Sequence, residues 1–235
     1  MDLTFAPADA AAIPLHVVAQ DALDAFCDAQ PDKVARWLRA TGFTGALGSV
    51  VGLPHLARAQ SPSIDEVLND PVAPEQGNPE GDVTIVEYFD YQCPYCKAMH
   101  PLLRDVVEAD GNVRLVMKDW PIFGPVSVYA AQAVQGAAAL GDYETALDAL
   151  MRANTRLSHE KVEEILTDAG LDFDAIAASV SKNQDAIGAL LDRNYHQAEA
   201  FQFNGTPSFV IGRTVYPGVL DRALLEEAIA KARAA

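Results

Sequence analysis

The chain has 235 residues, and its 33 acidic against 17 basic side chains give a formal net charge of -16. A surface this acidic repels phosphate backbones and anionic lipid, so nucleic acid is not an expected partner. Half of the residues are hydrophobic, yet no segment reaches the roughly 20 continuous apolar residues of a membrane span. The length fits one domain with additions or two small domains, with enough residues to bury a sizeable core.

Residues 1–60 are unlike the rest of the chain and are expected to be an N-terminal extension. Within it, residues 33–59 combine the basic Lys33, Arg36 and Arg39, a moderately apolar run and the closing Ala57-Arg58-Ala59. These are the parts of a secretory signal, although a signal normally begins near the N-terminus. A non-catalytic helical extension is the alternative, and both interpretations stay open.

The extension also carries a similarity to another family. Residues 13–53 resemble the N-terminal segment of leucyl aminopeptidases in the runs IPLHVVAQDALDAF and ARWLRATGF. The similarity covers none of the catalytic part of that family and therefore implies no activity. Cys27 lies in this region, and we expect it to be a small buried hydrophobic residue or, if exposed, a cysteine that pairs between chains.

Residues 61–82 are predicted to be a short helix followed by a linker. Ser63 can cap a helix over residues 64–68, with Glu66 as the acid of a capping box. The run that follows is rich in Pro, Gly and Asn, which favours an extended linker or a turn. The next segment, residues 83–89, is β-branched, aromatic and apolar on both faces, so it predicts a central strand covered on both sides.

The remaining elements follow from periodicity. Apolar residues recur at helical spacing after Cys93, and residues 113–117 predict a second strand, which makes a strand–helix–strand unit with a right-handed crossover. Helical patterns then fill residues 126–198, and two short strands and a terminal helix close the chain. The predicted helices of the block span residues 128–140, 143–153, 158–170, 174–180 and 184–200, and the closing elements span residues 208–211, 214–216 and 220–234. Ser158 is placed to cap the helix that begins there.

Two of the three cysteines, Cys93 and Cys96, are separated by two residues, which indicates either half of a zinc site or a redox pair. A structural zinc site needs two further Cys or His ligands at suitable spacing. Cys27 and five scattered histidines offer no second pair. Zinc is therefore disfavoured, and no resident metal or cofactor is expected.

Disulfide exchange needs a thiolate that attacks and a second thiol that resolves the mixed disulfide. Cys93 is predicted at the N-terminal end of a helix, where unpaired N–H groups and the helix dipole favour negative charge, and its sulfur is expected to be the more exposed of the two. Pro94 suits the first helical turn because its fixed φ matches the helix. Cys96 lies one turn later and points back toward Cys93. Cys93 is therefore the predicted nucleophile and Cys96 the predicted resolving thiol.

Neighbouring side chains have competing interpretations. Glu87, on the buried strand, is a candidate proton acceptor for Cys96, with Lys118 as a candidate ion partner; the alternative is an edge glutamate that faces solvent. His100 shares a helical face with Cys96 and as a cation could help to hold a thiolate, but a partly exposed surface histidine is the favoured interpretation. Met99 is expected in the core rather than as a copper ligand.

The chain resembles the DsbA-like thioredoxin family in three runs, NDPVAPEQGNPEGDVTIVEYFDYQCPYC, MKDWPIFGPVSVYAAQA and NGTPSFVIG, and the similarity extends over residues 65–230. It points to the periplasmic group that includes the suppressor-of-copper-sensitivity C proteins. In this family a helical domain is inserted into a thioredoxin fold. The resemblance thus implies an α/β, thioredoxin-like domain over residues 83–125 and 199–235, an inserted helical domain over residues 126–198, and a helical extension before them.

The resemblance also implies site residues that spacing alone does not reveal. Thr206-Pro207 matches the cis-proline loop of the family, which faces the dithiol and would pair with an extended substrate segment. Pro94 and Tyr95, between the cysteines, are the other expected substrate contacts. Glu87 matches the buried acid of the family by position. Tyr95 and Thr206 both differ from the residues of the strongest oxidant, which implies a moderate oxidant.

The predicted function is thiol–disulfide exchange with protein substrates, as an oxidase or an isomerase, in the periplasm. The expected partners are proteins with thiols or disulfides and a membrane redox partner protein, and an oligomer stays open because isomerases of this kind are usually oligomers. Cu(I) binding by the two soft thiolates is the alternative function. A glutathione-dependent enzyme is a weaker third hypothesis, because glutaredoxins with the same tetrapeptide are much shorter.

Overall fold

The computed structural model of the protein describes residues 62–235, so the signal-like segment, the aminopeptidase-like segment and Cys27 lie outside the described residues. The strands are β1 (Glu75–Gly77), β2 (Val83–Phe89), β3 (Val113–Asp119), β4 (Ser208–Ile211) and β5 (Thr214–Pro217). The helices are α3 (Ile64–Leu68), α4 (Pro94–Asp110), α5 (Pro125–Ala138), α6 (Tyr143–Arg152), α7 (His159–Asp168), α8 (Phe173–Lys182), α9 (Gln184–Ala200) and α10 (Arg222–Arg233).

The five strands of the described part form one sheet in the order β1-β3-β2-β4-β5. β2 and β3 are parallel and joined by α4, whereas the other neighbours are antiparallel. In the parallel pair, Glu87 is opposite Met117 and Phe89 is opposite Asp119. Because side chains alternate along a strand, these four residues share one face of the sheet.

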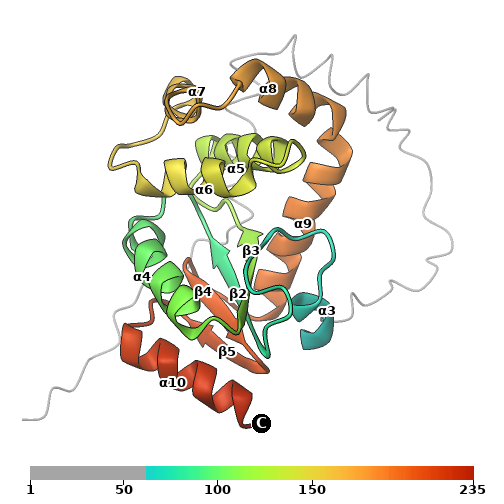
Figure 1. The fold of residues 1–235 in the computed structure, drawn as a ribbon. Helices are drawn as coiled ribbons and strands as arrows, with labels where there is room; N and C mark the ends of the chain where they lie inside the picture. The colour runs from blue at the N-terminus through green and yellow to red at the C-terminus, as the bar shows by residue number, and fades with distance from the viewer. Residues whose placement is uncertain (1–61) are drawn as a thin grey trace, which may run out of the picture. The chain divides into compact units, whose positions relative to one another are not determined.

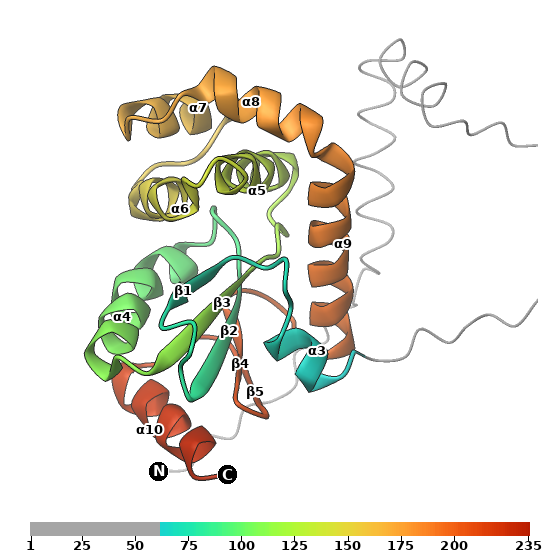
Figure 2. The same ribbon diagram turned by 45° about the vertical axis from the view of Figure 1, so that its right-hand side comes forward.

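Helices cover both faces of the sheet, as Figures 1 and 2 show. α4 and α10 lie on the face that carries Glu87, where the larger apolar cluster also includes residues of α5 and α6. α3 and α9 cover the opposite face, around Tyr88, Val116 and Trp120. The predicted central strand is therefore covered on both sides, which explains why it is apolar on both faces.

Helices α5 to α8 stack at one end of the sheet, and α9 runs back along it to β4 (Figure 2). Each predicted helix between residues 126 and 198 is present, with its ends displaced by no more than three residues. Two local caps also match the prediction. The Ser63 hydroxyl accepts the Glu66 N–H while the Glu66 carboxylate accepts the Ser63 N–H, and Ser158 accepts the Lys161 N–H at the start of α7.

The structure differs from the prediction at β1, which lies in the expected linker. Its three residues pair with β3, and the neighbouring Met117 N–H donates to the Pro74 carbonyl at 2.9 Å. The strand ends at Gly77, whose φ of 71° suits glycine, and a Cβ there would lie 2.5 Å from the Val113 carbonyl oxygen. A three-residue edge strand held by backbone pairing has too short a side-chain pattern to be predicted.

Candidate functional site

The dithiol stands at the start of α4, directly after the central strand. Cys93 is the N-cap residue, Pro94 is in the first turn, and the Cys93 sulfur accepts the Cys96 N–H at 3.3 Å. The turn before it is fixed by Asp90, which is buried and accepts four hydrogen bonds. Its partners are the N–H groups of Gln92, Ile122 and Phe123 and the hydroxyl of Ser127.

The two thiols differ in acidity. Hydrogen bonding by the Cys96 thiol, opposed by burial, lowers the pKa of Cys93 to about 6. Burial raises the pKa of Cys96 well above its usual range, and the Cys93 hydrogen bond and the charge of Glu87 add to the increase. At neutral pH the pair therefore holds one thiolate, at Cys93, and one thiol, at Cys96.

The expected difference in exposure between the sulfurs is wrong. Both cysteines are free, and both are 0% exposed. The Cys93 sulfur is covered by the loop before β4, and it lies 3.2 Å from the Thr206 carbonyl oxygen. The acidity of the two thiols, rather than access to them, distinguishes their chemistry.

The loop that covers Cys93 contains Thr206 and Pro207, and the peptide bond between them is cis. This places the backbone of Thr206 beside a sulfur that is 113 residues away in sequence. The Pro207 carbonyl accepts the Gly218 N–H at 3.1 Å, so the turn after β5 lies against the same loop. Of the remaining predicted contact residues, Pro94 is exposed and Tyr95 is 65% exposed.

Glu87 is fully buried on the sheet face that α4 covers, which excludes the alternative of a solvent-facing edge glutamate. Neither of its carboxylate oxygens has a hydrogen-bond partner among residues 62–235. Burial, and secondarily the charge of Cys93, raises the pKa of Glu87 to about 8. A carboxyl group in this state carries its proton at neutral pH and can exchange it with a nearby thiol.

The predicted ion pair between Glu87 and Lys118 is wrong. Lys118 is opposite Tyr88 rather than Glu87, so its side chain lies on the other face of the sheet. It is fully buried there and pairs with Asp70, which also binds Arg193 at 3.0 Å. This ion pair connects the segment after α3 to β3 and α9, and Glu87 has no cationic partner among residues 62–235.

His100 is also placed differently from the favoured prediction. It is 3% exposed, and its Nε2 lies 2.8 Å from the Asp148 carboxylate on α6. Arg104 and Arg152 bind the same carboxylate, each at 2.9 Å. Burial lowers the pKa of His100, against the opposing effect of Asp148. The histidine therefore links α4 to α6. It is buried because α6 packs on the face of α4 that was predicted to be exposed to solvent.

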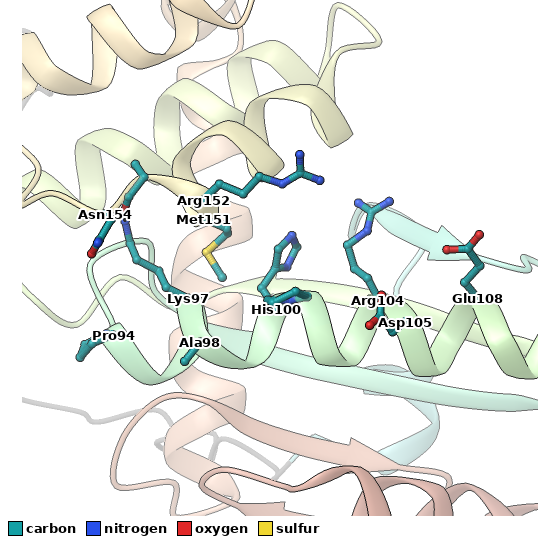
Figure 3. A pocket seen from close by; sticks show the side chains of 12 residues that line it. Pro94, Lys97, Ala98, His100, Arg104, Asp105, Glu108, Met151, Arg152 and Asn154 are labelled. Atoms are coloured by element: carbon teal, nitrogen blue, oxygen red, sulfur yellow. Dashed lines mark hydrogen bonds between the residues drawn. The ribbon is translucent and has the colours of Figure 1, made fainter.

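A cavity of about 610 Å³ lies along this junction, between α4 and the end of α6. Figure 3 shows His100 and Arg104 extending from α4 toward Met151 and Arg152 of α6. The Lys97 ammonium donates to the carbonyls of Leu150 and Ala153. Neither cysteine lines the cavity. The side chains of Lys97, Arg104 and Arg152 that line it already bind groups within the protein. We therefore interpret the cavity as a feature of helix packing and not as part of the dithiol site.

Sequence reasoning missed Phe123 and Val219, which together with the predicted contact Tyr95 form an apolar rim next to the dithiol. Their side chains are between 51% and 65% exposed. The Gln92 side chain donates to the Phe123 carbonyl at 3.2 Å, which places Phe123 next to the residue before Cys93. Val219 follows Gly218, which binds the loop of Pro207. Single exposed apolar residues are ordinary in a sequence, so only their convergence in space reveals this surface.

Residues 62–235 contain no group of three or more His, Cys, Asp or Glu side chains arranged for a metal ion. The two thiols of the dithiol could themselves hold a soft ion such as Cu(I). No helix in this described part is both long and apolar enough to cross a membrane.

Comparisons with known proteins agree with this architecture. The family model described as thioredoxin matches residues 69–231. A thioredoxin-like oxidoreductase from Silicibacter pomeroyi DSS-3 is 39% identical, with a TM-score of 0.71, over 74% of this chain and 99% of that one. The thiol-disulfide exchange protein alpha-DsbA2 from Wolbachia pipientis is 25% identical, with a TM-score of 0.67, over 71% and 90%. The catalytic domain of Proteus mirabilis ScsC is 29% identical, with a TM-score of 0.63, over 73% and 94%.

The curated relatives are longer proteins. The chain is 26% identical over 200 residues to Na(+)/H(+) antiporter NhaA 3 from Salinispora tropica, which covers 84% of this chain and 29% of the antiporter. It spans less than a third of each of the first curated relatives it matches, so their transport activity does not carry over. The predicted α/β, thioredoxin-like fold is confirmed. The family match and the solved structures together show that the chain belongs to the thioredoxin family, with the fold of the DsbA-like thiol–disulfide oxidoreductases.

Proposed function

We propose that the protein exchanges disulfides with protein substrates through Cys93 and Cys96. The observation that carries the proposal is the dithiol at the start of α4, where the Cys93 sulfur accepts the Cys96 N–H at 3.3 Å and lies 3.2 Å from the Thr206 carbonyl oxygen. In this setting the pKa of the Cys93 thiol is lowered to about 6, whereas the pKa of the buried Cys96 thiol is raised. Because the thiolate is the nucleophile, this difference in pKa makes Cys93 the attacking group at neutral pH, while Cys96 stays a protonated thiol until it resolves the mixed disulfide.

In the reducing direction, the Cys93 thiolate attacks a substrate disulfide and one substrate sulfur leaves as a thiolate. Cys96 then attacks Cys93, the bond between Cys93 and the substrate breaks, and the second substrate thiolate is released. The Cys96 proton passes to Glu87 in the fraction of molecules whose Glu87 has released its own proton, because a pKa of about 8 leaves a minor carboxylate population at neutral pH. The substrate gains two electrons, and the protein loses two as the Cys93–Cys96 disulfide forms. Oxidation of a dithiol substrate is the same sequence in reverse.

Substrate contacts are assigned to Pro94, Tyr95, Thr206 and Pro207. The Thr206 backbone beside the Cys93 sulfur is suited to pair with an extended polypeptide. Tyr95, Phe123 and Val219 add exposed apolar surface on three segments that border the dithiol. Such a surface favours unfolded or extended segments with apolar residues near the reacting cysteine.

Within this function, the protein acts in the periplasm as an oxidase or as an isomerase. A membrane redox partner protein would re-oxidise the oxidase or keep the isomerase reduced. Secretion is supported by the signal-like residues 33–59 and by the resemblance to periplasmic family members. An isomerase would be an oligomer that presents several dithiols to one substrate. A strict monomer by light scattering, without activity on scrambled ribonuclease, would leave the oxidase role.

Trapping experiments test the exchange reaction. The Cys96→Ser variant should accumulate mixed disulfides with substrate proteins through Cys93, because the resolving thiol is gone. The Cys93→Ser variant should form none and should lose insulin reduction. Non-reducing electrophoresis with mass spectrometry identifies the linked cysteine. Mixed disulfides through Cys96 in the presence of intact Cys93 would reverse the assignment.

Cu(I) binding is the second candidate, favoured by the two free thiols at one helix terminus. Anaerobic titration of the reduced protein with Cu(I) tests it. Binding that disappears in the Cys93→Ala and Cys96→Ala variants would support this role, whereas binding that survives both would remove the dithiol from it.

A further inference from the structure

The segment between β3 and α5 carries Phe123, and side chains of the turn before the dithiol hold this segment in place. The Phe123 N–H donates to the Asp90 carboxylate at 3.0 Å, and the Phe123 carbonyl accepts the Gln92 side-chain amide at 3.2 Å. The N–H of the neighbouring Ile122 donates to the same carboxylate at 2.7 Å. Both backbone polar groups of Phe123 are therefore bound by side chains of residues that closely precede Cys93 in the sequence.

Ser127, in the first turn of α5, closes these side chains into one network. Its hydroxyl donates to the Asp90 carboxylate at 2.7 Å and accepts the Gln92 side-chain amide at 3.1 Å. Asp90 is 1% exposed and Ser127 is 0% exposed. Because water has little access to these groups, their hydrogen bonds are not exchanged for bonds to solvent, and a satisfied buried network of this kind is rigid. We refer to Asp90, Gln92 and Ser127 as the clamp.

The segment that the clamp holds has no regular secondary structure of its own. It runs from Trp120 to Gly124, between the end of β3 and the start of α5. Pro121 and Pro125 offer no backbone N–H, and Gly124 has a φ of 95°, a conformation that favours glycine. Because no helix or strand ladder fixes this segment, the clamp sets the backbone position of Phe123.

Packing does not explain why Phe123 is held in this way. Its side chain is 51% exposed, so it contributes little to the core. Fixing the backbone under an exposed aromatic side chain costs conformational entropy and keeps apolar surface in water, and neither stabilises the fold. A fixed apolar surface does lower the cost of binding, because less freedom is lost when a partner docks on it. The arrangement therefore fits a surface that is prepared for a partner beside Cys93.

We propose that the clamp of Asp90, Gln92 and Ser127 positions Phe123 so that the dithiol prefers polypeptide segments with an apolar side chain next to the reacting cysteine. The proposal rests on the proposed exchange function and deepens it, by assigning three positioning residues and a substrate class. The side-chain hydrogen bonds of the clamp go to one another and to the backbone of residues 92, 122 and 123. The three residues thus act through Phe123 and are not catalytic residues.

Activated peptides measure this preference directly. Two peptides differ only in the residue next to their single cysteine, phenylalanine in one and serine in the other, and each is linked to thionitrobenzoate through a disulfide. The Cys93 thiolate attacks the peptide sulfur, a disulfide forms between protein and peptide, and thionitrobenzoate leaves with the electron pair of the broken bond. The absorbance of thionitrobenzoate, followed at increasing peptide concentration, gives a half-saturating concentration and a maximal rate for each peptide.

We expect Gln92→Ala to raise the half-saturating concentration of the phenylalanine peptide about fivefold, with its maximal rate and both values for the serine peptide within about twofold of wild type. Ser127→Ala should act in the same direction by about threefold. The matched control is Gln132→Ala, further along α5 beside a small cavity, and it should change none of these values. Circular dichroism confirms that each variant is folded, and Ser127→Ala tests the proposal if Gln92→Ala does not fold.

A double-mutant cycle with Phe123→Ser separates positioning from a general structural effect. If the clamp acts through Phe123, adding Gln92→Ala to Phe123→Ser should change the half-saturating concentration by less than about twofold. Effects that multiply in the double variant would overturn the proposal. An equal loss with both peptides would do the same, as would wild-type values in folded Gln92→Ala and Ser127→Ala. Failure of the proposed function looks different, because the wild type would then release thionitrobenzoate from both peptides no faster than Cys93→Ser.

Discussion

Replacement of Glu87 by Gln gives a direct measure of what the buried carboxyl costs the fold. The pKa of Glu87 is about 8 in the folded protein, against 4.5 for an ordinary glutamate. The unfolded chain therefore releases this proton at lower pH than the folded one, and Glu87 destabilises the fold increasingly as pH rises from about 4.5 to 8. At 1.36 kcal/mol per unit, the wild type should lose about 2.5 kcal/mol between pH 5 and pH 7 through this group alone.

Glu87→Gln removes this titration while keeping the shape of the side chain, so its stability should fall less over the same interval. Urea unfolding of the reduced proteins at pH 5 and pH 7 measures the difference, and titrating groups that do not interact with Glu87 contribute equally to both proteins. The exposed Glu227→Gln on α10 is the control and should follow the wild type. Equal pH dependence of wild type and Glu87→Gln would refute the assignment of a buried, protonated Glu87.

Three further predictions concern packing, buried charge and substrate contact. Lys118→Met leaves the buried Asp70 carboxylate with only the part-exposed Arg193 as a cationic partner among the described residues. Urea unfolding should show that the free energy of unfolding falls by about 3 kcal/mol, and the rate of Cys93 alkylation should not change. Gly136→Ala places a Cβ 2.5 Å from a side chain of α8 and should destabilise by about 1 to 2 kcal/mol, whereas Gly188→Ala, with open space, should stabilise by up to about 1 kcal/mol. Phe123→Ser should slow exchange with unfolded proteins several-fold but not with a small disulfide, and the equally exposed Leu140→Ser should slow neither.

Local sequence patterns predicted most of the fold. The continuous apolar run at residues 83–89 gave the bounds of β2, and Ser63 and Ser158 each marked the start of a helix through a cap that depends on neighbours three residues away. The order of strands and helices then followed from periodicity. These features share one property: the residues that decide them are close together in the chain.

The site was predicted less completely, because its contacts depend on register and on distant segments. Glu87 and Lys118 occur on neighbouring strands, but an offset of one residue places them on opposite sheet faces. His100 is buried only because α6 packs on α4. Phe123 and Val219 lie on segments that approach the dithiol from distant parts of the chain, and nothing in their local sequence indicates this.

The central claim is that Cys93 is a thiolate at neutral pH because Cys96 stabilises it. The rate of alkylation of the reduced protein by iodoacetamide, followed against pH with the labelled cysteine identified by mass spectrometry, tests this directly. The account predicts labelling of Cys93 with a midpoint near the pKa of about 6, and a higher midpoint in Cys96→Ala, which removes the largest stabilising hydrogen bond. A midpoint near the ordinary thiol value of 9, or first labelling at Cys96, would contradict it.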